Sequence, residues 1–169
     1  MSAERALRAL LVFDVDGTLC DSSSADGLLP VEWQSQQDFT AWYEAVRNTD
    51  FPPMRGAKAM VAALLANQPG ADVYVMSARP VCVLDATEAW IARHFPELHG
   101  AKFWFRWEDD VLSSVESKMA RLIVLADPTT YLQVTVVDDD EKMMAPCLTA
   151  GYTFVPAWQI TRRVEQARG

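Results

Sequence analysis

The chain of 169 residues has few of the residues that staple small folds or bind zinc, since it contains three cysteines and two histidines. Cys20, Cys82 and Cys147 are odd in number and widely spaced, which argues against a disulfide framework and against a zinc knuckle. His94 and His99 do not have the spacing of metal ligands. We therefore expect reduced thiols, and neither histidine is assigned to metal binding or catalysis.

Basic charge is also scarce, with 15 Lys and Arg against 23 Asp and Glu and a formal net charge of −8. Binding along extended duplex nucleic acid draws on clustered Lys and Arg, so we do not expect it, whereas a small anionic ligand bound with the help of a metal fits. The sequence has no apolar run long enough to span a bilayer and no charged segment followed by an apolar export core. We expect a cytoplasmic protein without a membrane partner, and the sequence leaves the oligomeric state open.

The chain does have alternating strand-like and helix-like segments, over a length that fits one domain, residues 1–169. Apolar and β-branched runs predict strands, and apolar residues at helical spacing predict helices. Strands are predicted at 9–13, 73–76, 102–106, 134–137 and 152–155, and helices at 39–46, 56–66, 83–95 and after Ser113. Strands separated by helices imply a mainly parallel sheet, covered on both faces, in a Rossmann-like three-layer α/β/α sandwich.

Two segments need separate comment. Residues 20–55 are polar and form a short cap or flap insert, in which Trp33, Trp42 and Tyr43 either anchor the insert to the body or line a flap over the site. Ser113 with Glu116 three residues later predicts a capping box. The apolar stripe of the helix that follows is expected at Val115, Met119, Leu122, Ile123 and Ala126.

Carboxylates follow two of the predicted strands: Asp14 and Asp16 come after the first, and Asp138, Asp139 and Asp140 come after the fourth. In right-handed strand–helix–strand units the strand ends and helix starts meet at one edge of the sheet. Crowded carboxylates repel one another unless a cation is present, and their hard oxygen ligands suit Mg²⁺. Other polar residues are predicted at the same edge, namely Thr18, Ser77, Arg79, Arg106 and Lys118.

Such a cluster can transfer a phosphoryl group. A carboxylate can attack phosphorus and form an aspartyl-phosphate, and Asp14 is suited to this role. Asp16 could protonate the leaving oxygen and then take a proton from the attacking water. Ser77 can donate a hydrogen bond to bound phosphate, and Lys118 can neutralise its charge.

These residues resemble the four ordered motifs of the haloacid dehalogenase (HAD) superfamily: D-V-D-G-T-L at 14–19, V-M-S-A-R at 75–79, Lys118, and V-V-D-D at 136–139. The resemblance implies a HAD-like fold with Asp14 as nucleophile and Asp16 as acid and base. It implies Mg²⁺ on Asp14, the Asp16 backbone carbonyl and the acidic pair, with Asp139 as the metal ligand and Asp138 as a partner of Lys118. Because dehalogenases lack the second Asp of the first motif, Asp16 favours a phosphatase.

S-A-R-P at 77–80, T-E-A-W-I at 87–91 and F-R-W-E-D-D at 105–110 are similar to the phosphatase domain of phage-type polynucleotide kinase-phosphatases. That resemblance implies a substrate with a 3′-phosphorylated nucleic acid end or a nucleotide, and it adds Arg79, Arg106 and Asp110 as candidates. The chain departs from that family at Ser114 and Asp140, where an acidic residue and an arginine are usual. It also has no P-loop kinase motif, so the resemblance implies a stand-alone phosphatase.

Two alternatives remain open. The first is a phosphatase of small sugar or organic phosphates. The second is a phospho-accepting signalling module like a response-regulator receiver, although a receiver places its acidic pair after the first strand and its phospho-acceptor after the third. A further open point is whether Phe103, Trp104, Phe105 and Trp107 stack on nucleotide bases or pack in the core.

Overall fold

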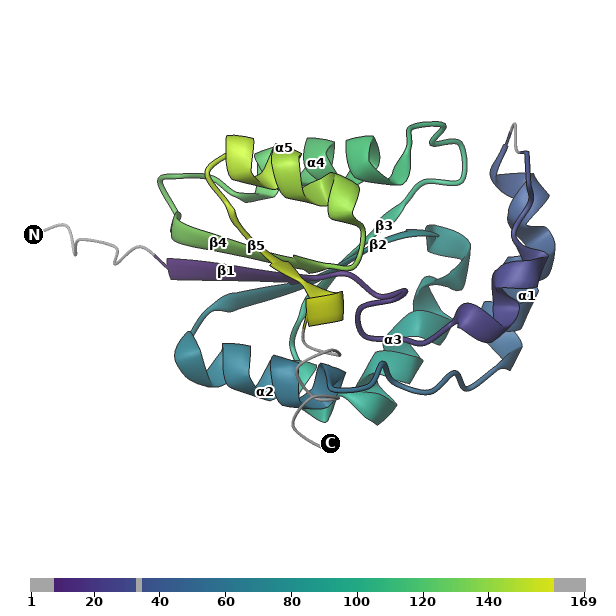
Figure 1. Cartoon of the computed structure of the whole chain (residues 1–169), viewed down its shortest axis with the longest axis horizontal. Helices are drawn as coiled ribbons and strands as arrows, with labels where there is room; N and C mark the ends of the chain where they lie inside the picture. Colours follow the sequence, from purple (N-terminus) through teal and green to yellow (C-terminus); the bar gives the residue numbers. More distant parts are fainter. Residues whose placement is uncertain (1–7, 33–34, 160–169) are drawn as a thin grey trace, which may run out of the picture.

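The computed structural model describes residues 8–32 and 35–159. Its centre is a five-stranded sheet of parallel neighbours in the order β3-β2-β1-β4-β5 (Figure 1). The strands are β1 (Arg8–Phe13), β2 (Asp72–Pro80), β3 (Lys102–Arg106), β4 (Tyr131–Asp138) and β5 (Thr153–Pro156).

Helices cover both faces of the sheet, α2 and α3 on one side and α4 and α5 on the other (Figure 1). The α-helices are α1 (Thr40–Asn48), α2 (Ala57–Asn67), α3 (Leu84–His94), α4 (Ser114–Leu125) and α5 (Met144–Thr149). Short 3₁₀ turns are η1 (Ser23–Leu28), η2 (Gln36–Phe39), η3 (Val81–Val83), η4 (Pro96–Leu98) and η5 (Glu141–Met143). The predicted α/β three-layer architecture is confirmed.

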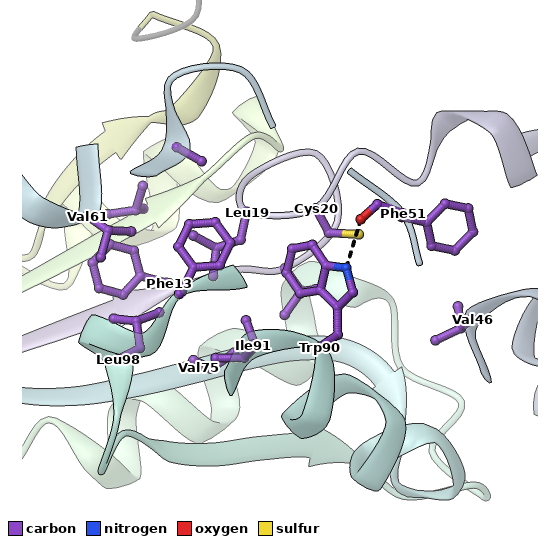
Figure 2. Close-up of a cluster of buried hydrophobic side chains, with 14 of the residues drawn as sticks. Phe13, Leu19, Cys20, Val46, Phe51, Val61, Val75, Trp90, Ile91 and Leu98 are labelled. Atoms are coloured by element: carbon purple, nitrogen blue, oxygen red, sulfur yellow. Dashed lines mark hydrogen bonds between the residues drawn. The ribbon is translucent and has the colours of Figure 1, made fainter. Parts of the chain in front are cut away.

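Strand β1 is buried on both faces, as the central strand of a covered parallel sheet must be. Leu11 and Phe13 join the apolar cluster on the side of α2 and α3, which Figure 2 shows around Phe13. Leu10 and Val12 point to the opposite cluster, under α4 and α5. This alternation fixes the register of β1 and therefore the face and edge at which Asp14 emerges.

The predicted strands and helices are present, with informative differences. Strand β2 runs on to Pro80, and a register shift between Ser77 and Pro80 lets it stay paired with β3, so Ser77 and Arg79 lie in the strand and not after it. Helix α5 was not predicted, because its six residues are too few to show a helical period and include Pro146.

The predicted stripe of α4 is wrong at Ile123, whose side chain is 64% exposed. The other predicted residues are confirmed, since Leu122 and Ala126 are buried and Val115 and Met119 pack against their cluster. The buried face also carries Ser117 and Lys118. Helical spacing defines which residues share a face but not which of two adjacent faces is turned to the sheet. Here the buried face is the one that carries Lys118.

The insert at 20–55 lies beyond the carboxyl ends of the strands, where Figure 1 shows α1. Trp42 and Tyr43 belong to the same buried cluster as Phe13, as an anchoring role requires, whereas Trp33 lies outside the described residues. A second anchor is the Trp90 indole Nε1, which donates to the Phe51 carbonyl over 2.8 Å (Figure 2). Within 8–32 and 35–159, no helix has the length and apolar character needed to cross a bilayer.

The capping box of α4 gives a test of local stability. The Ser113 hydroxyl accepts from the Glu116 backbone N–H, and the Glu116 carboxylate accepts from the Ser113 N–H over 2.9 Å. We expect Ser113→Ala to lower the free energy of unfolding by about 1 kcal/mol, because the first turn loses a capping acceptor. Urea unfolding measures this. The exposed Ser24 serves as the control, and an equal loss in Ser24→Ala would contradict the capping role.

Candidate active site

The site lies at the carboxyl ends of β1 and β4, where the strand order reverses. Ligands of open α/β sheets bind in the crevice at such a switch point. Phe13 pairs with Val137 across the two strands, and the Asp14 N–H donates to the Val137 carbonyl over 2.9 Å. This register brings Asp14 beside Asp138, 124 residues later in the chain, at the same sheet edge.

Lys118 connects these two carboxylates. Its Nζ donates to Asp14 Oδ1 and to Asp138 Oδ2, each over 2.7 Å, and all three residues are at least 95% buried. Burial lowers the pKa of Lys118, but the charges of Asp14 and Asp138 outweigh it, so its pKa lies above the ordinary value. Lys118 is therefore a fixed cation in the floor of the site.

Two carboxylates of the cluster, Asp14 and Asp139, are harder to ionise than free aspartates. Burial raises the pKa of Asp14 well above its usual range, against the opposing charge of Lys118, and Asp138 and Asp139 raise it further. At the rim, desolvation and then the charge of Asp138 raise the pKa of Asp139 to about 6. Added positive charge would favour the ionised forms.

The donor set fits a hard divalent cation. Carboxylate oxygens of Asp14, Asp138 and Asp139 lie within 4.8 Å of one another. Gly17 shapes the same space: with φ of +74°, a Cβ at this position would lie 2.3 Å from Asp139 Oδ2. The loop thus passes against the Asp139 carboxylate, and oxygen ligands of this kind suit Mg²⁺. The Asp16 backbone carbonyl stays a predicted ligand of the cation, whereas the Asp16 carboxylate accepts from Arg79 and Ser22.

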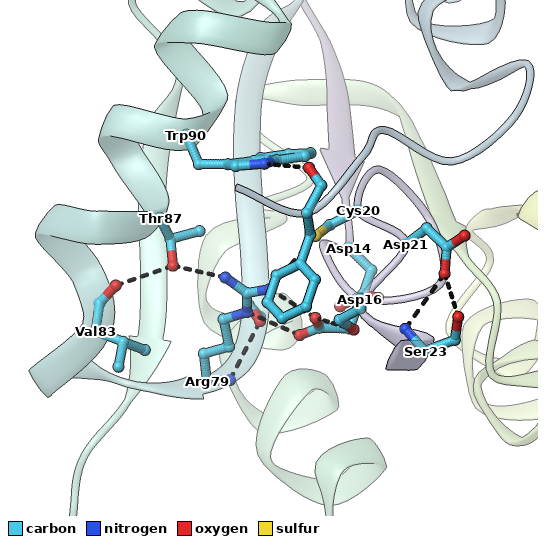
Figure 3. Close-up of polar contacts among 12 residues, drawn as sticks. Asp14, Asp16, Cys20, Asp21, Ser23, Arg79, Val83, Thr87 and Trp90 are labelled. Carbon is cyan, nitrogen blue, oxygen red and sulfur yellow. Dashed lines mark hydrogen bonds and ion pairs between the residues drawn. The ribbon is translucent and has the colours of Figure 1, made fainter. Parts of the chain in front are cut away.

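Asp16 forms a two-point ion pair with Arg79 (Figure 3). Arg79 Nε donates to Asp16 Oδ2 over 2.8 Å and Nη2 to Oδ1 over 2.6 Å, while the Ser22 hydroxyl donates to Oδ1 over 2.8 Å. Arg79 Nη1 donates to Thr87 Oγ1 over 2.9 Å, and the Trp42 ring covers the guanidinium at 5.5 Å. Arg79 was predicted to bind phosphate, but this geometry directs it to Asp16.

The remaining predicted residues lie nearby in different roles. Ser77 is buried at the end of β2, and its Oγ accepts from the Arg79 N–H over 3.2 Å. Thr18 is buried, and its hydroxyl has no hydrogen-bond partner in the described part of the chain. Arg106 donates to the carbonyls of Asp110 and Leu112, so it supports the loop between β3 and α4.

Sequence reasoning missed Ser22, Thr87 and the contact of Trp42 with Arg79. Thr87 carried a faint signal, since it is a polar residue on the buried face of α3. The aromatic residues in and after β3 differ in burial. Phe105 is buried, Phe103 and Trp104 are half-buried, and Trp107 is 70% exposed on the loop toward α4. Core packing therefore explains Phe105 but not Trp107.

No protein-family model matches the chain, and no curated protein matches its sequence. Solved structures do match. A chain of the Pnkp1/Rnl/Hen1 RNA repair complex aligns with a TM-score of 0.65 and 17% identity, over 92% of this chain and 44% of that chain. This protein thus spans less than half of the chain that it matches in that complex.

Two smaller structures align along most of their length. The HAD domain of the effector protein Lem4 from Legionella pneumophila gives a TM-score of 0.51 at 13% identity, over 89% of this chain and 85% of that one. A hydrolase from Streptococcus pneumoniae TIGR4 gives a TM-score of 0.53 at 12% identity, over 92% of this chain and 97% of that one. The likeness at these identities is one of fold, and the predicted HAD-like fold is confirmed.

Removing the central cation should destabilise the protein in a pH-dependent way. Lys118→Met leaves two buried carboxylates without their partner, so we expect a loss of about 3 kcal/mol in unfolding free energy at pH 7. Lys118 lowers the pKa of Asp14, so its removal raises that pKa further. Protonation at low pH therefore stabilises the folded variant more than the unmodified protein, and the loss should shrink at pH 5. Urea unfolding at both pH values measures it. The exposed Lys102→Met is the control, and a loss that does not depend on pH would contradict this reading.

Cation binding should weaken as Asp139 takes up its proton. We expect saturating Mg²⁺ to raise the thermal unfolding midpoint at pH 7.5 and to raise it much less at pH 5, below the pKa of about 6. Asp139→Asn should abolish the shift, whereas the exposed Asp109→Asn should keep it. Differential scanning calorimetry provides the readout, and an unchanged shift in Asp139→Asn would refute the cation site.

Proposed function

We propose that this protein is a Mg²⁺-dependent phosphomonoesterase that works through an aspartyl-phosphate on Asp14. The observation that carries the proposal is the buried Lys118 ammonium, 2.7 Å from both Asp14 and Asp138 at the switch point of the sheet. The fold it shares with a HAD domain and with a hydrolase supports the same class of reaction.

The residues divide the reaction into two displacements. A carboxylate oxygen of Asp14 attacks phosphorus, the bond from phosphorus to the substrate oxygen breaks, and a proton from Asp16 goes to that leaving oxygen. Water then attacks the phosphoryl group while Asp16 takes a proton from it, which restores the Asp14 carboxylate and releases phosphate. Lys118 orients Asp14, and a bound Mg²⁺ would supply charge neutralisation on the phosphoryl oxygens.

Arg79 is the residue that positions Asp16 in this scheme. Its other contacts, to Thr87 and Trp42, hold the guanidinium from two further directions. Arg79 is only 4% exposed. Burial lowers the pKa of Arg79 but the Asp16 charge outweighs it, so Arg79 remains charged. Ser77 and Thr18 are left as the proposed phosphate contacts, together with Lys118.

The substrate we propose is a nucleotide or a 3′-phosphorylated nucleic acid end. Two observations support this substrate. The first is the pair of motifs around Arg79 and at residues 105–110, and the second is the structural likeness to a chain of an RNA repair complex. Small sugar and organic phosphates are the second candidate, because the same cluster would act on any phosphomonoester that reaches it.

The sheet order opposes the receiver alternative. Receivers of the flavodoxin-like class have the order 2-1-3-4-5, whereas this sheet has the order 3-2-1-4-5 of the other doubly wound class. In addition, the paired acids Asp138 and Asp139 follow β4, and Asp14 follows β1. Catalytic turnover is therefore favoured over stable phosphorylation.

Phosphate release tests the proposal. With Mg²⁺, we expect the protein to release phosphate from at least one of three substrates at matched concentrations: a 3′-phosphorylated oligonucleotide, a mononucleotide and a sugar phosphate. Asp14→Asn should lower every such rate by at least about 10³-fold, because it removes the nucleophile. Asp109→Asn should retain the rates. Absence of turnover on a broad phosphomonoester panel would exclude the enzyme.

A further inference from the structure

Thr87 is a polar residue on the buried face of α3, and none of its surface is exposed. Its hydroxyl group is used in both directions. It donates to the Val83 carbonyl over 2.9 Å and accepts from Arg79 Nη1 over 2.9 Å (Figure 3). Because a hydroxyl has one proton, the bond to Val83 leaves the oxygen lone pairs for Arg79. The acceptor is therefore fixed in direction as well as in place.

The position of Thr87 follows from the local fold. Val83 is the N-cap residue of α3, and a threonine four residues later can bond back to its carbonyl. The turn η3 between β2 and α3 returns this first part of the helix to Arg79, which precedes Thr87 by eight residues in the chain. The bond between these two side chains thus joins a helix to the strand that carries the arginine.

The guanidinium of Arg79 passes this restraint on to Asp16. Because the group is planar, fixing Nη1 sets the plane in which Nε and Nη2 meet the two carboxylate oxygens, over 2.8 and 2.6 Å. Among the residues that the structure describes, Thr87 holds the one oxygen outside Asp16 that accepts from this guanidinium. The sulfur of Cys20, 3.7 Å from Nη2, is a weak acceptor. Thr87 is therefore the contact that sets the angle of the ion pair.

Asp16 is held in this way at the wall of a cleft. Asp16 and Arg79 line this cleft together with Trp42 and Tyr43 of the insert, and its volume is about 270 Å³. The Arg79 side chain is 3% exposed and the Asp16 side chain 30%. The carboxylate therefore borders the open space while the group that holds it is buried, as a proton donor to a leaving oxygen requires.

We propose that Thr87 is a positioning residue, which holds Asp16 through Arg79 in the geometry for proton transfer to the leaving group. The inference rests on the proposed function, because it takes Asp16 as the proton donor. Without the Thr87 hydroxyl a buried N–H of Arg79 loses its acceptor, which is costly, and the guanidinium turns toward another acceptor. A displacement of about 1 Å at a catalytic group can lower a rate roughly 10²-fold.

The dependence of the rate on the leaving group tests this role. The phenolate of 4-nitrophenyl phosphate leaves without a proton because its charge spreads into the ring, whereas the alkoxide of an alkyl phosphate needs one. The alkyl phosphate is the one of the three substrates above that the protein hydrolyses fastest. We expect Thr87→Val, which keeps the shape of the side chain without its hydroxyl, to lower kcat/KM for this substrate at least about tenfold more than for 4-nitrophenyl phosphate.

Two further variants identify the group responsible. Thr87→Ser keeps the hydroxyl and should restore the ratio of the two kcat/KM values. Arg79→Lys keeps the charge but loses the planar fork, so it should shift the ratio in the same direction as Thr87→Val. If Thr87→Val does not fold, Thr87→Ala removes the same hydroxyl with a smaller side chain.

Thr135→Val is the matched control. Thr135 is also a buried threonine, on β4, but its hydroxyl accepts from Gln68 and not from Arg79. Loss of this hydroxyl should change the two rates equally, so the ratio should stay that of the unmodified protein.

Hydrogen exchange at Arg79, followed by NMR, makes the test independent of turnover. The Nε–H of Arg79 should exchange with solvent at least about fivefold faster in Thr87→Val than in the unmodified protein, Thr87→Ser and Thr135→Val, because one hydrogen bond fewer opposes its opening. Unchanged exchange in Thr87→Val would overturn the positioning role by itself.

The kinetic outcomes separate the positioning role from the proposed function. Equal losses on both substrates in Thr87→Val, or a ratio that Thr87→Ser does not restore, would overturn the positioning role and retain the phosphatase. Absence of phosphate release by the unmodified protein would overturn the proposed function and with it the role in proton transfer, while the exchange rates would still show whether Thr87 holds Arg79.

Discussion

The contact on which the site depends is the buried Lys118 ammonium between Asp14 and Asp138. Three parts of the fold must be correct for it to form: the register of β1 against β4, the end of β4, and the face that α4 turns to the sheet. The positive charge of the ammonium compensates the two aspartates in the buried site, where their mutual repulsion would otherwise be severe. The site is thus a product of tertiary packing more than of any one loop.

Much of this arrangement could be predicted from the sequence, because its causes are local or topological. The capping box at Ser113 depends on residues three apart, and the meeting of Asp14 with Asp138 follows from parallel strands that end at one edge. The pair formed by Asp16 and Arg79 could not be predicted in the same way. These residues are 63 apart, and the partner of Arg79 depends on how far β2 continues through its register shift. Ile123 was misplaced because spacing alone does not select the buried face.

The insert bounds the space beside Asp16 with residues that also stabilise the fold. Trp42 and Tyr43 contribute to the buried cluster around Phe13 and line the cleft beside Asp16. A single aromatic segment therefore holds the insert in place and shapes the space beside Asp16.

Arg79 joins segments that are distant in the sequence. Its guanidinium contacts Asp16 after β1 and Thr87 on α3 (Figure 3), and it also lies over the ring of Trp42 in the insert. A genetic screen for loss of function would consequently hit more of the chain than its carboxylates. Thr87 lies on a helix that gives no ligand to the acidic cluster, yet it holds Arg79 against Asp16. Alleles at codon 87 would therefore resemble alleles at Asp16.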